Sequence, residues 1–118
     1  MSTSVDNYLM AAIYKTPEFS TWLENLADAN ALVRIQTRIE RLARGNPGDV
    51  EPVGAGVSEL RIHYGPGYRV YFATRGELVI LLLVGGDKRT QAKDIKRAIK
   101  LLTEIKDANH EIFKPDSV

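Results

Sequence analysis

Residues 57–84 constrain the fold more than any other part of the chain, because polar and apolar side chains alternate there with the period of a β-strand. Leu60 and Ile62 fall on one face of the first run, and Gly65-Pro66-Gly67 is typical of a hairpin turn. A second alternating run follows the turn. The third, over 77–84, is apolar on both faces, as in a strand buried inside a sheet. The segment therefore predicts three strands of one sheet.

The second face of the predicted hairpin is polar and mostly cationic. It collects side chains from both strands: Glu59, Arg61, His63, Arg69 and Tyr71. A three-residue turn predicts that His63 lies opposite Arg69, and the same register places Arg61 opposite Tyr71. Like charges side by side destabilise a sheet, so this arrangement indicates an anionic ligand.

These side chains suit the binding and cleavage of single-stranded RNA. Arginine holds phosphate oxygens, and tyrosine and histidine stack on unpaired bases. Cleavage without a metal needs a base for the 2′-OH proton, an acid for the leaving oxygen and cations for the transition state. We therefore predict that Arg61 and Arg69 stabilise the charge, while His63 or Tyr71 transfers the protons. The same pattern also fits an exposed, salt-bridged sheet, because Glu59 and Arg61 share a face.

Two amphipathic helices are predicted before these strands. Thr16 is typical of an N-cap and Pro17 of a first helical position, so one helix begins there and runs to about residue 26. The second helix spans residues 29–43 and ends at Gly45, which suits a left-handed C-cap. The short connection predicts an antiparallel helical hairpin.

The remaining segments complete one α+β domain over residues 1–118. An apolar run predicts a first strand over 8–14, the Gly- and Pro-rich segment 46–56 is predicted as a loop, and a last helix spans 90–106. The resulting order is β-α-α-β-β-β-α. We expect a mostly antiparallel sheet whose apolar face packs on the helices.

Composition narrows the chemistry and the location. The chain has no cysteine, and its two histidines have no carboxylate at ligand spacing on a shared helix, so we expect no metal and no cofactor. The longest apolar run, residues 78–84, is far shorter than the ~20 residues that a membrane span needs. The N-terminus lacks the pattern of a signal peptide, and we expect a cytoplasmic protein.

Basic residues concentrate in the middle of the chain although the net charge is only +1. Residues 34–100 hold thirteen Lys and Arg against seven Asp and Glu. Arg38 and Arg41 lie on the flank of the second helix, and Lys88 and Arg89 follow the third hairpin strand. We predict these four as RNA-binding residues, although solvated helix faces would give the same count.

Three motifs occur in the order typical of one group of bacterial proteins: Glu59-Leu60-Arg61-Ile62, Tyr68-Arg69-Val70-Tyr71-Phe72 and Gly85-Gly86-Asp87-Lys88. With the helical segment "FSTWLENLADANALVRIQTRIERLARGNPGD" before them, the chain resembles the RelE/ParE superfamily of toxins. Within it, the chain is most similar to the HigB-like, phage Gp49-like addiction module killer proteins. The resemblance covers nearly the whole chain.

This resemblance implies the toxin of a type II toxin–antitoxin pair. The implied partners are a cognate antitoxin, the ribosome and mRNA, with DNA reached only through the antitoxin complex. Many such toxins are metal-independent endoribonucleases, or mRNA interferases, that cut mRNA in the ribosomal A site. The ParE branch instead inhibits DNA gyrase without cutting RNA, and an inactive RNA-binding remnant is a further alternative.

The resemblance also assigns individual residues. Arg69 matches the strand arginine of the RNase branch, and Lys88 or Arg89 matches the basic residue after the last strand. Some members add a C-terminal histidine or tyrosine as acid or base, whereas here only His110 follows. His63 or Tyr71 is therefore left as the proton-transfer group.

Overall fold

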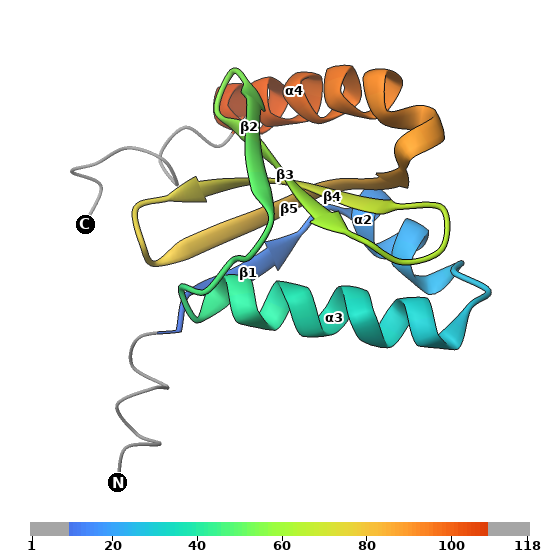
Figure 1. The fold of residues 1–118 in the computed structure, drawn as a ribbon. Coiled ribbons are helices and arrows are strands. Elements are labelled where there is room, and N and C mark those ends of the chain that lie inside the picture. Colours follow the sequence, from blue (N-terminus) through green and yellow to red (C-terminus); the bar gives the residue numbers. More distant parts are fainter. Residues whose placement is uncertain (1–9, 109–118) are drawn as a thin grey trace, which may run out of the picture.

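The computed structural model describes residues 10–108, which form a five-stranded sheet with helices on both faces (Figure 1). The strand order is β1-β5-β4-β3-β2. The strands are β1 (Ala12–Lys15), β2 (Val50–Gly54), β3 (Val57–Ile62), β4 (Tyr68–Arg75) and β5 (Val79–Asp87). Only the β1–β5 pair is parallel among the pairs of this sheet, so the predicted α+β class with a mostly antiparallel sheet is confirmed. The predicted start of the first strand lies outside the described residues.

Three α-helices pack on this sheet: α2 (Pro17–Glu24), α3 (Ala29–Ala43) and α4 (Gln91–Ala108), the last preceded by the short 3-10 helix η1 (Lys88–Thr90). The predicted limits of α3 are confirmed, and Gly45 has the expected positive φ of 87° after it. Figure 1 shows α3 and α4 on opposite sides of the sheet. The prediction that all helices share one face is therefore wrong for α4.

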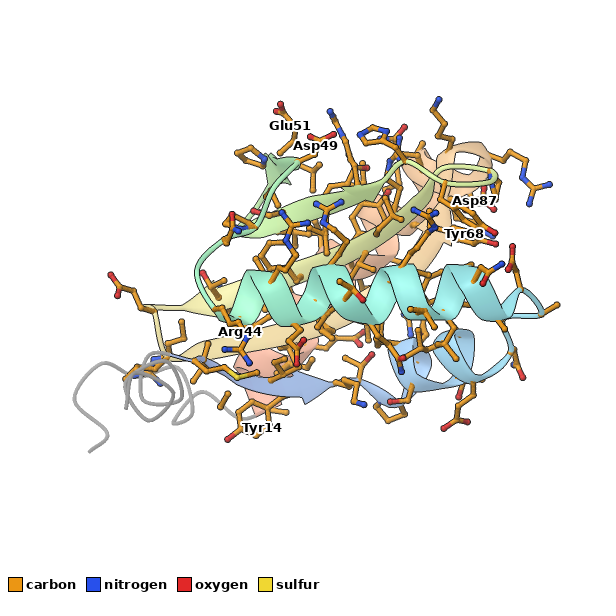
Figure 2. All side chains as sticks on the ribbon, turned by 60° about the horizontal axis from the view of Figure 1, so that its bottom comes forward. Tyr14, Arg44, Asp49, Glu51, Tyr68 and Asp87 are labelled. Atoms are coloured by element: carbon orange, nitrogen blue, oxygen red, sulfur yellow. The ribbon has the colours of Figure 1, made fainter. Side chains whose placement is uncertain are left out.

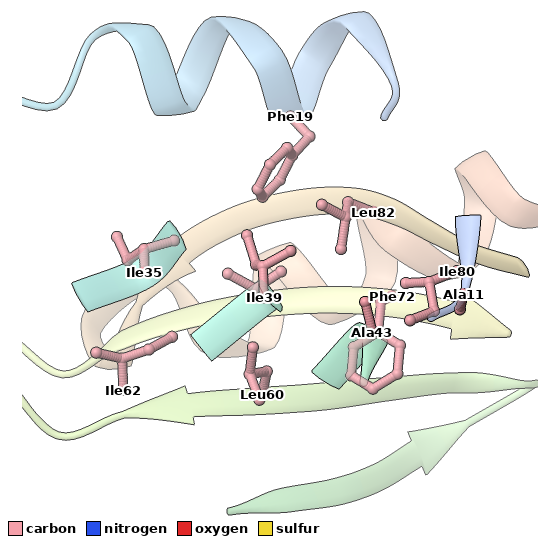
Figure 3. Close-up of a cluster of buried hydrophobic side chains, with 11 residues drawn as sticks. Ala11, Phe19, Ile35, Ile39, Ala43, Leu60, Ile62, Phe72, Ile80 and Leu82 are labelled. Carbon is pink, nitrogen blue, oxygen red and sulfur yellow. The ribbon is translucent and has the colours of Figure 1, made fainter. Parts of the chain in front are cut away.

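The larger core lies between the sheet and the pair α2 and α3. Figure 3 shows Phe19 of α2 and Ile35 and Ile39 of α3 beside Leu60 and Leu82 of the sheet, all of them buried. Helical spacing places Ile35 and Ile39 one turn apart on one face of α3, while the alternation of β3 turns Leu60 toward them. This is the apolar face that the sequence pattern predicts.

A second core explains the position of α4. Tyr71 and Leu83 lie on the opposite face of the sheet, together with Val57 near one end of β3. Ala98 and Leu102 of α4 pack against this set, and all are buried. The face predicted to be exposed and polar is thus half apolar, and α4 covers it because burial of this surface stabilises the fold.

The register of the β3–β4 hairpin differs from the predicted one. Ile62 pairs with Tyr68 and Arg61 with Arg69, so the pairing of His63 with Arg69 is wrong, and His63 lies beyond the ladder. The turn is longer because Gly67 N–H donates to Tyr64 C=O at 3.0 Å and closes an extra loop. The error shifts the pairing by two residues, which leaves every side chain on its predicted face.

The segment predicted as a loop contains the strand β2, so the chain has one strand more than the predicted order. Val50–Gly54 pairs antiparallel with β3 and has a register irregularity between Pro52 and Gly54. Proline lacks a backbone N–H and is tolerated in a strand chiefly at a sheet edge. β2 is such an edge, and its proline and glycine conceal it from a sequence pattern.

Two consecutive glycines near the end of β5 allow helices to approach the strand from both faces. A Cβ on Gly85 would lie 2.1 Å from Trp22 Cε3, and one on Gly86 would lie 1.9 Å from Asp94 Oδ2. Trp22 belongs to α2 and Asp94 to α4. The glycine pair is therefore a packing requirement of the fold.

The predicted N-cap at Thr16 is confirmed and has a second function. Thr16 Oγ1 accepts a hydrogen bond from Phe19 N–H at 3.0 Å and donates one to Leu83 C=O at 2.7 Å. We expect Thr16→Ala to lower the free energy of unfolding by about 2 kcal/mol, because a cap and a buried hydrogen bond are both lost. Urea unfolding measures this, and Thr16→Ser should retain most of the stability. A loss of less than about 0.5 kcal/mol would contradict the double role.

Candidate functional site

A buried carboxylate lies at the centre of the cationic sheet face. Glu59 is 0% exposed, and its Oε1 accepts a hydrogen bond from Arg61 Nε at 2.9 Å. Its Oε2 accepts from Tyr71 Oη at 2.8 Å and from Gln91 Nε2 at 2.6 Å, and lies 3.7 Å from Arg69 Nε. We call these five residues the Glu59 cluster. It joins β3, β4 and the first residue of α4.

The hydrogen bonds keep Glu59 ionised despite its burial. Burial alone would raise the pKa of Glu59, but the donors Arg61, Gln91 and Tyr71 together hold that pKa below its usual value. Burial, followed by the hydrogen bond to Glu59, raises the pKa of the Tyr71 phenol. Tyr71 is also completely buried, so the prediction that it transfers a proton to or from a substrate is corrected: it is a donor to Glu59.

Arg69 lies behind the surface and not on it. It is 5% exposed, and its Nη1 donates to Gly67 C=O at 3.0 Å and to Tyr68 C=O at 3.1 Å. Gly67 lies between this arginine and Lys88. A Cβ atom added at Gly67 would lie 2.8 Å from Lys88 Cδ and 3.5 Å from Arg69 Nη1. Lys88 is exposed and Arg69 is buried, so the two predicted cations converge beside Gly67 at different depths.

His63 reaches the cluster through an aspartate that sequence analysis missed. Its side chain is 69% exposed, and Nε2 lies 2.5 Å from Asp49 Oδ2. Asp49 Oδ1 in turn lies 3.8 Å from Arg61 Nη1. The hydrogen bond from His63 is the largest cause that lowers the pKa of Asp49, and the charge of Arg61 adds to it, while burial opposes both. A continuous chain of contacts therefore links His63 to Glu59.

Arg61 is the cation that this chain of contacts presents to solvent. Its side chain is 33% exposed, with Glu59 on the Nε side and Asp49 on the Nη1 side. The hydrogen bond to Glu59 is the main cause that raises the pKa of Arg61. The two carboxylates offset part of its positive charge, but they also hold the guanidinium in place, so its remaining N–H donors could bind an oxyanion with little rearrangement.

A second basic surface lies between α3 and the end of β3. A groove of about 340 Å³ lies there, and its charged or titratable lining residues are Arg34, Arg38, Arg41, His63 and Tyr64. Arg38 has a structural role, since Nη1 donates to Arg61 C=O at 2.6 Å and Nη2 to Pro47 C=O at 2.9 Å. Arg41 is exposed, so of the two arginines predicted on α3 it is the one open to an RNA chain.

Arg89 already has a counter-ion. Its Nη2 lies 2.9 Å from Asp87 Oδ2 and its Nε 3.2 Å from Oδ1. The hydrogen bond to Asp87 raises the pKa of Arg89. Asp87 is the residue of β5 that pairs with Tyr68 of β4, and Figure 2 shows the two next to each other. Because the side chain is exposed, the pair stabilises little, yet it lowers the positive charge available to a phosphate. Lys88 is thus the better placed of the two predicted cations.

Two further findings concern residues 10–108 alone. Within this range, no three side chains of the histidine, cysteine, aspartate and glutamate types are placed to share a metal ion. None of the helices there has the length and apolar character to cross a membrane. His110, considered above as a terminal acid or base, lies outside the described residues.

Sequence analysis missed Asp49 and Gln91 and underestimated Glu59. Asp49 sits in a turn-like segment, and its partner His63 is 14 residues away, so no periodic pattern connects them. Gln91 is 32 residues from Glu59, and the two meet because α4 returns over the polar face. A signal did exist for Glu59, since an acidic residue alone among cations on a sheet face is expected to be their counter-ion.

The fold and this site define a small α+β protein with a fixed cationic cluster on one sheet face. Residues 21–107 match the Gp49-like family of phage-derived proteins, and the chain belongs to this family. It is a family of addiction module toxins of the RelE/HigB type, which confirms the resemblance and indicates the toxin of a toxin–antitoxin pair, with an antitoxin as partner. The chain is also similar to an uncharacterized protein of Haemophilus influenzae. The two are 46% identical over 93 residues, which cover 79% of this chain and 94% of the relative.

Proposed function

We propose that this toxin is a metal-independent endoribonuclease that cuts mRNA on the ribosome and so inhibits translation in the cytoplasm. The observation that carries the proposal is the chain of contacts from exposed His63 through Asp49 to Arg61. It links an imidazole, which can accept and donate a proton, through Asp49 to an ordered cation.

Each residue has a role in cleavage. His63 takes the proton of the 2′-OH as its oxygen attacks phosphorus and the P–O5′ bond breaks, and the leaving 5′ oxygen takes a proton from solvent water. Asp49 orients the imidazole and stabilises its protonated form. Arg61 and Lys88 stabilise the charge on the phosphate oxygens in the transition state. Arg69 is buried beneath these exposed cations and adds positive charge to the site without contacting the RNA.

The partners follow from this activity and from the family. The ribosome presents mRNA as a single strand, and the α3 groove with Arg41 offers a second contact for RNA phosphates. The antitoxin prevents cleavage by binding the toxin, and DNA is reached only through the complex of the two proteins.

Expression of the chain without antitoxin, followed by transcriptome-wide mapping of mRNA 5′ ends, tests the proposal. New ends inside translated codons are expected. His63→Gln should reduce their rate of appearance about 100-fold or more, and Arg61→Gln about as much, because an acid–base group and a charge-stabilising group each contribute at least that factor. Lys93→Ala, at an exposed position of α4, is the matched control and should cleave like the wild type.

Other outcomes are equally informative. Growth arrest without new mRNA ends would reject RNA cleavage and point to a gyrase inhibitor of the ParE kind. The absence of arrest, with RNA binding retained, would identify an inactive remnant. Full cleavage by His63→Gln would remove His63 from the mechanism.

A further inference from the structure

We propose that Glu59 and Gln91 are positioning residues, which hold the guanidinium of Arg61 in the orientation that binds the phosphate. The inference rests on the proposed function, since it assigns to both residues a part in that reaction. Neither residue touches the substrate. Both act through Arg61.

Arg61 is held although it is partly exposed. An exposed arginine samples many rotamers, and a ligand that binds it must usually order it first. Here Glu59 Oε1 accepts from Arg61 Nε at 2.9 Å, and Asp49 Oδ1 lies 3.8 Å from Nη1. Contacts at two sites of the planar guanidinium restrict its tilt as well as its position.

Glu59 is suited to positioning and not to proton transfer. It is 0% exposed, so no substrate atom can reach it in this conformation. Its two oxygens accept three hydrogen bonds and also face Arg69, which uses most of the acceptor capacity of a carboxylate. Because this carboxylate is rigidly held, its hydrogen bond restricts the orientation of the Arg61 guanidinium.

Gln91 holds the Glu59 carboxylate from α4, the helix on the opposite side of the sheet from α3. It is the first residue of α4, and its Nε2 donates to Glu59 Oε2 at 2.6 Å. That bond and the one from Tyr71 hold Oε2 inside, which directs Oε1 toward Arg61. The apolar contacts of α4 are made elsewhere on the helix, so loss of the Gln91 donor should leave the helix docked.

The test replaces Gln91 with methionine, which has a similar length and no donor, and Glu59 with glutamine, which keeps the shape and removes the charge. Lys93→Met, on the exposed side of the same helix, is the control. The first measurement is the NMR order parameter of the Arg61 Nε–Hε bond. We expect a rigid value in the wild type and the control, and a value below about 0.6 in Gln91→Met and Glu59→Gln.

The second measurement is ribosome-dependent cleavage of a defined mRNA. A positioning role predicts that Gln91→Met lowers kcat/KM about tenfold while its thermal midpoint stays above the assay temperature. An Arg61 that stays rigid in the variants overturns the proposal, as does a mobile Arg61 with unchanged cleavage. If Glu59→Gln fails to fold, Gln91→Met decides. If the wild type cuts no RNA, the proposed function fails, while the order parameter still decides whether these residues hold Arg61.

Discussion

Replacement of Glu59 with alanine is expected to lower the free energy of unfolding by about 3–5 kcal/mol, the cost of leaving a buried charge without its partner. Arg69 is 5% exposed and would keep its positive charge in the interior. Tyr71 and Gln91 would lose their acceptor as well. Urea unfolding at pH 7 measures the loss, and Glu51→Ala, at an exposed position that pairs with Glu59, should change stability little.

The same group makes stability depend on pH. The pKa of Glu59 is lower in the folded protein than its usual value of 4.5, so the folded state favours the charged form. Its stabilisation is complete well above pH 4.5 and is lost as the pH falls through the folded-state pKa. As the pH is lowered below about 4.5, the urea midpoint of the wild type should therefore decrease, and that of Glu59→Gln should decrease less. Equal slopes in both proteins would contradict this assignment.

The second large effect is expected at Gly85. Gly85→Ala places a methyl group 2.1 Å from Trp22 Cε3, a separation that the packed core cannot accept without displacing α2 or β5. We expect a loss of about 3 kcal/mol, at the upper end for overpacking. Thermal or urea unfolding of the purified variant measures it.

A double-mutant cycle identifies the cause of that loss. Trp22→Leu destabilises the protein by itself because it removes aromatic contacts with Phe19 and Tyr68. In the Trp22→Leu background, however, the added methyl group at Gly85 should cost much less. A coupling of about 2 kcal/mol is expected, and additive losses would show that the indole ring is not what excludes a side chain at position 85.

The elements that could be predicted from sequence have their signals within a few residues. Thr16 and Pro17 start α2 because a cap and a fixed φ act locally, and Gly45 follows the end of α3 for the same reason. The β3–β4 register could not be predicted, since Gly65-Pro66-Gly67 is compatible with more than one turn length.

For the candidate site, the sequence predicted which face of the sheet carries each side chain but not how deeply each side chain is buried. Arg61 and Arg69 lie on the predicted face because a shift of two residues conserves side-chain direction. The alternation does not reveal that the Arg69 side chain is 6% exposed and the Arg61 side chain 33% exposed, because both occupy the same face. Contacts between residues far apart in sequence leave no periodic pattern, which also explains why Asp49 and Gln91 were missed.

Arg38 of α3 donates hydrogen bonds to the carbonyls of Pro47 and Asp49, and also to that of Arg61 in β3. It therefore holds the segment that contains Asp49 against α3. Gln91 fastens Glu59 from α4, on the other side of the sheet. Under the proposed function, Arg61 is thus aligned only when both layers have docked. Gln91 belongs to α4 and Arg61 to β3, so a chain terminated before α4 would contain the whole cationic strand and still lack this support for Arg61. Under the proposed function, we therefore expect such a truncated product not to cut RNA.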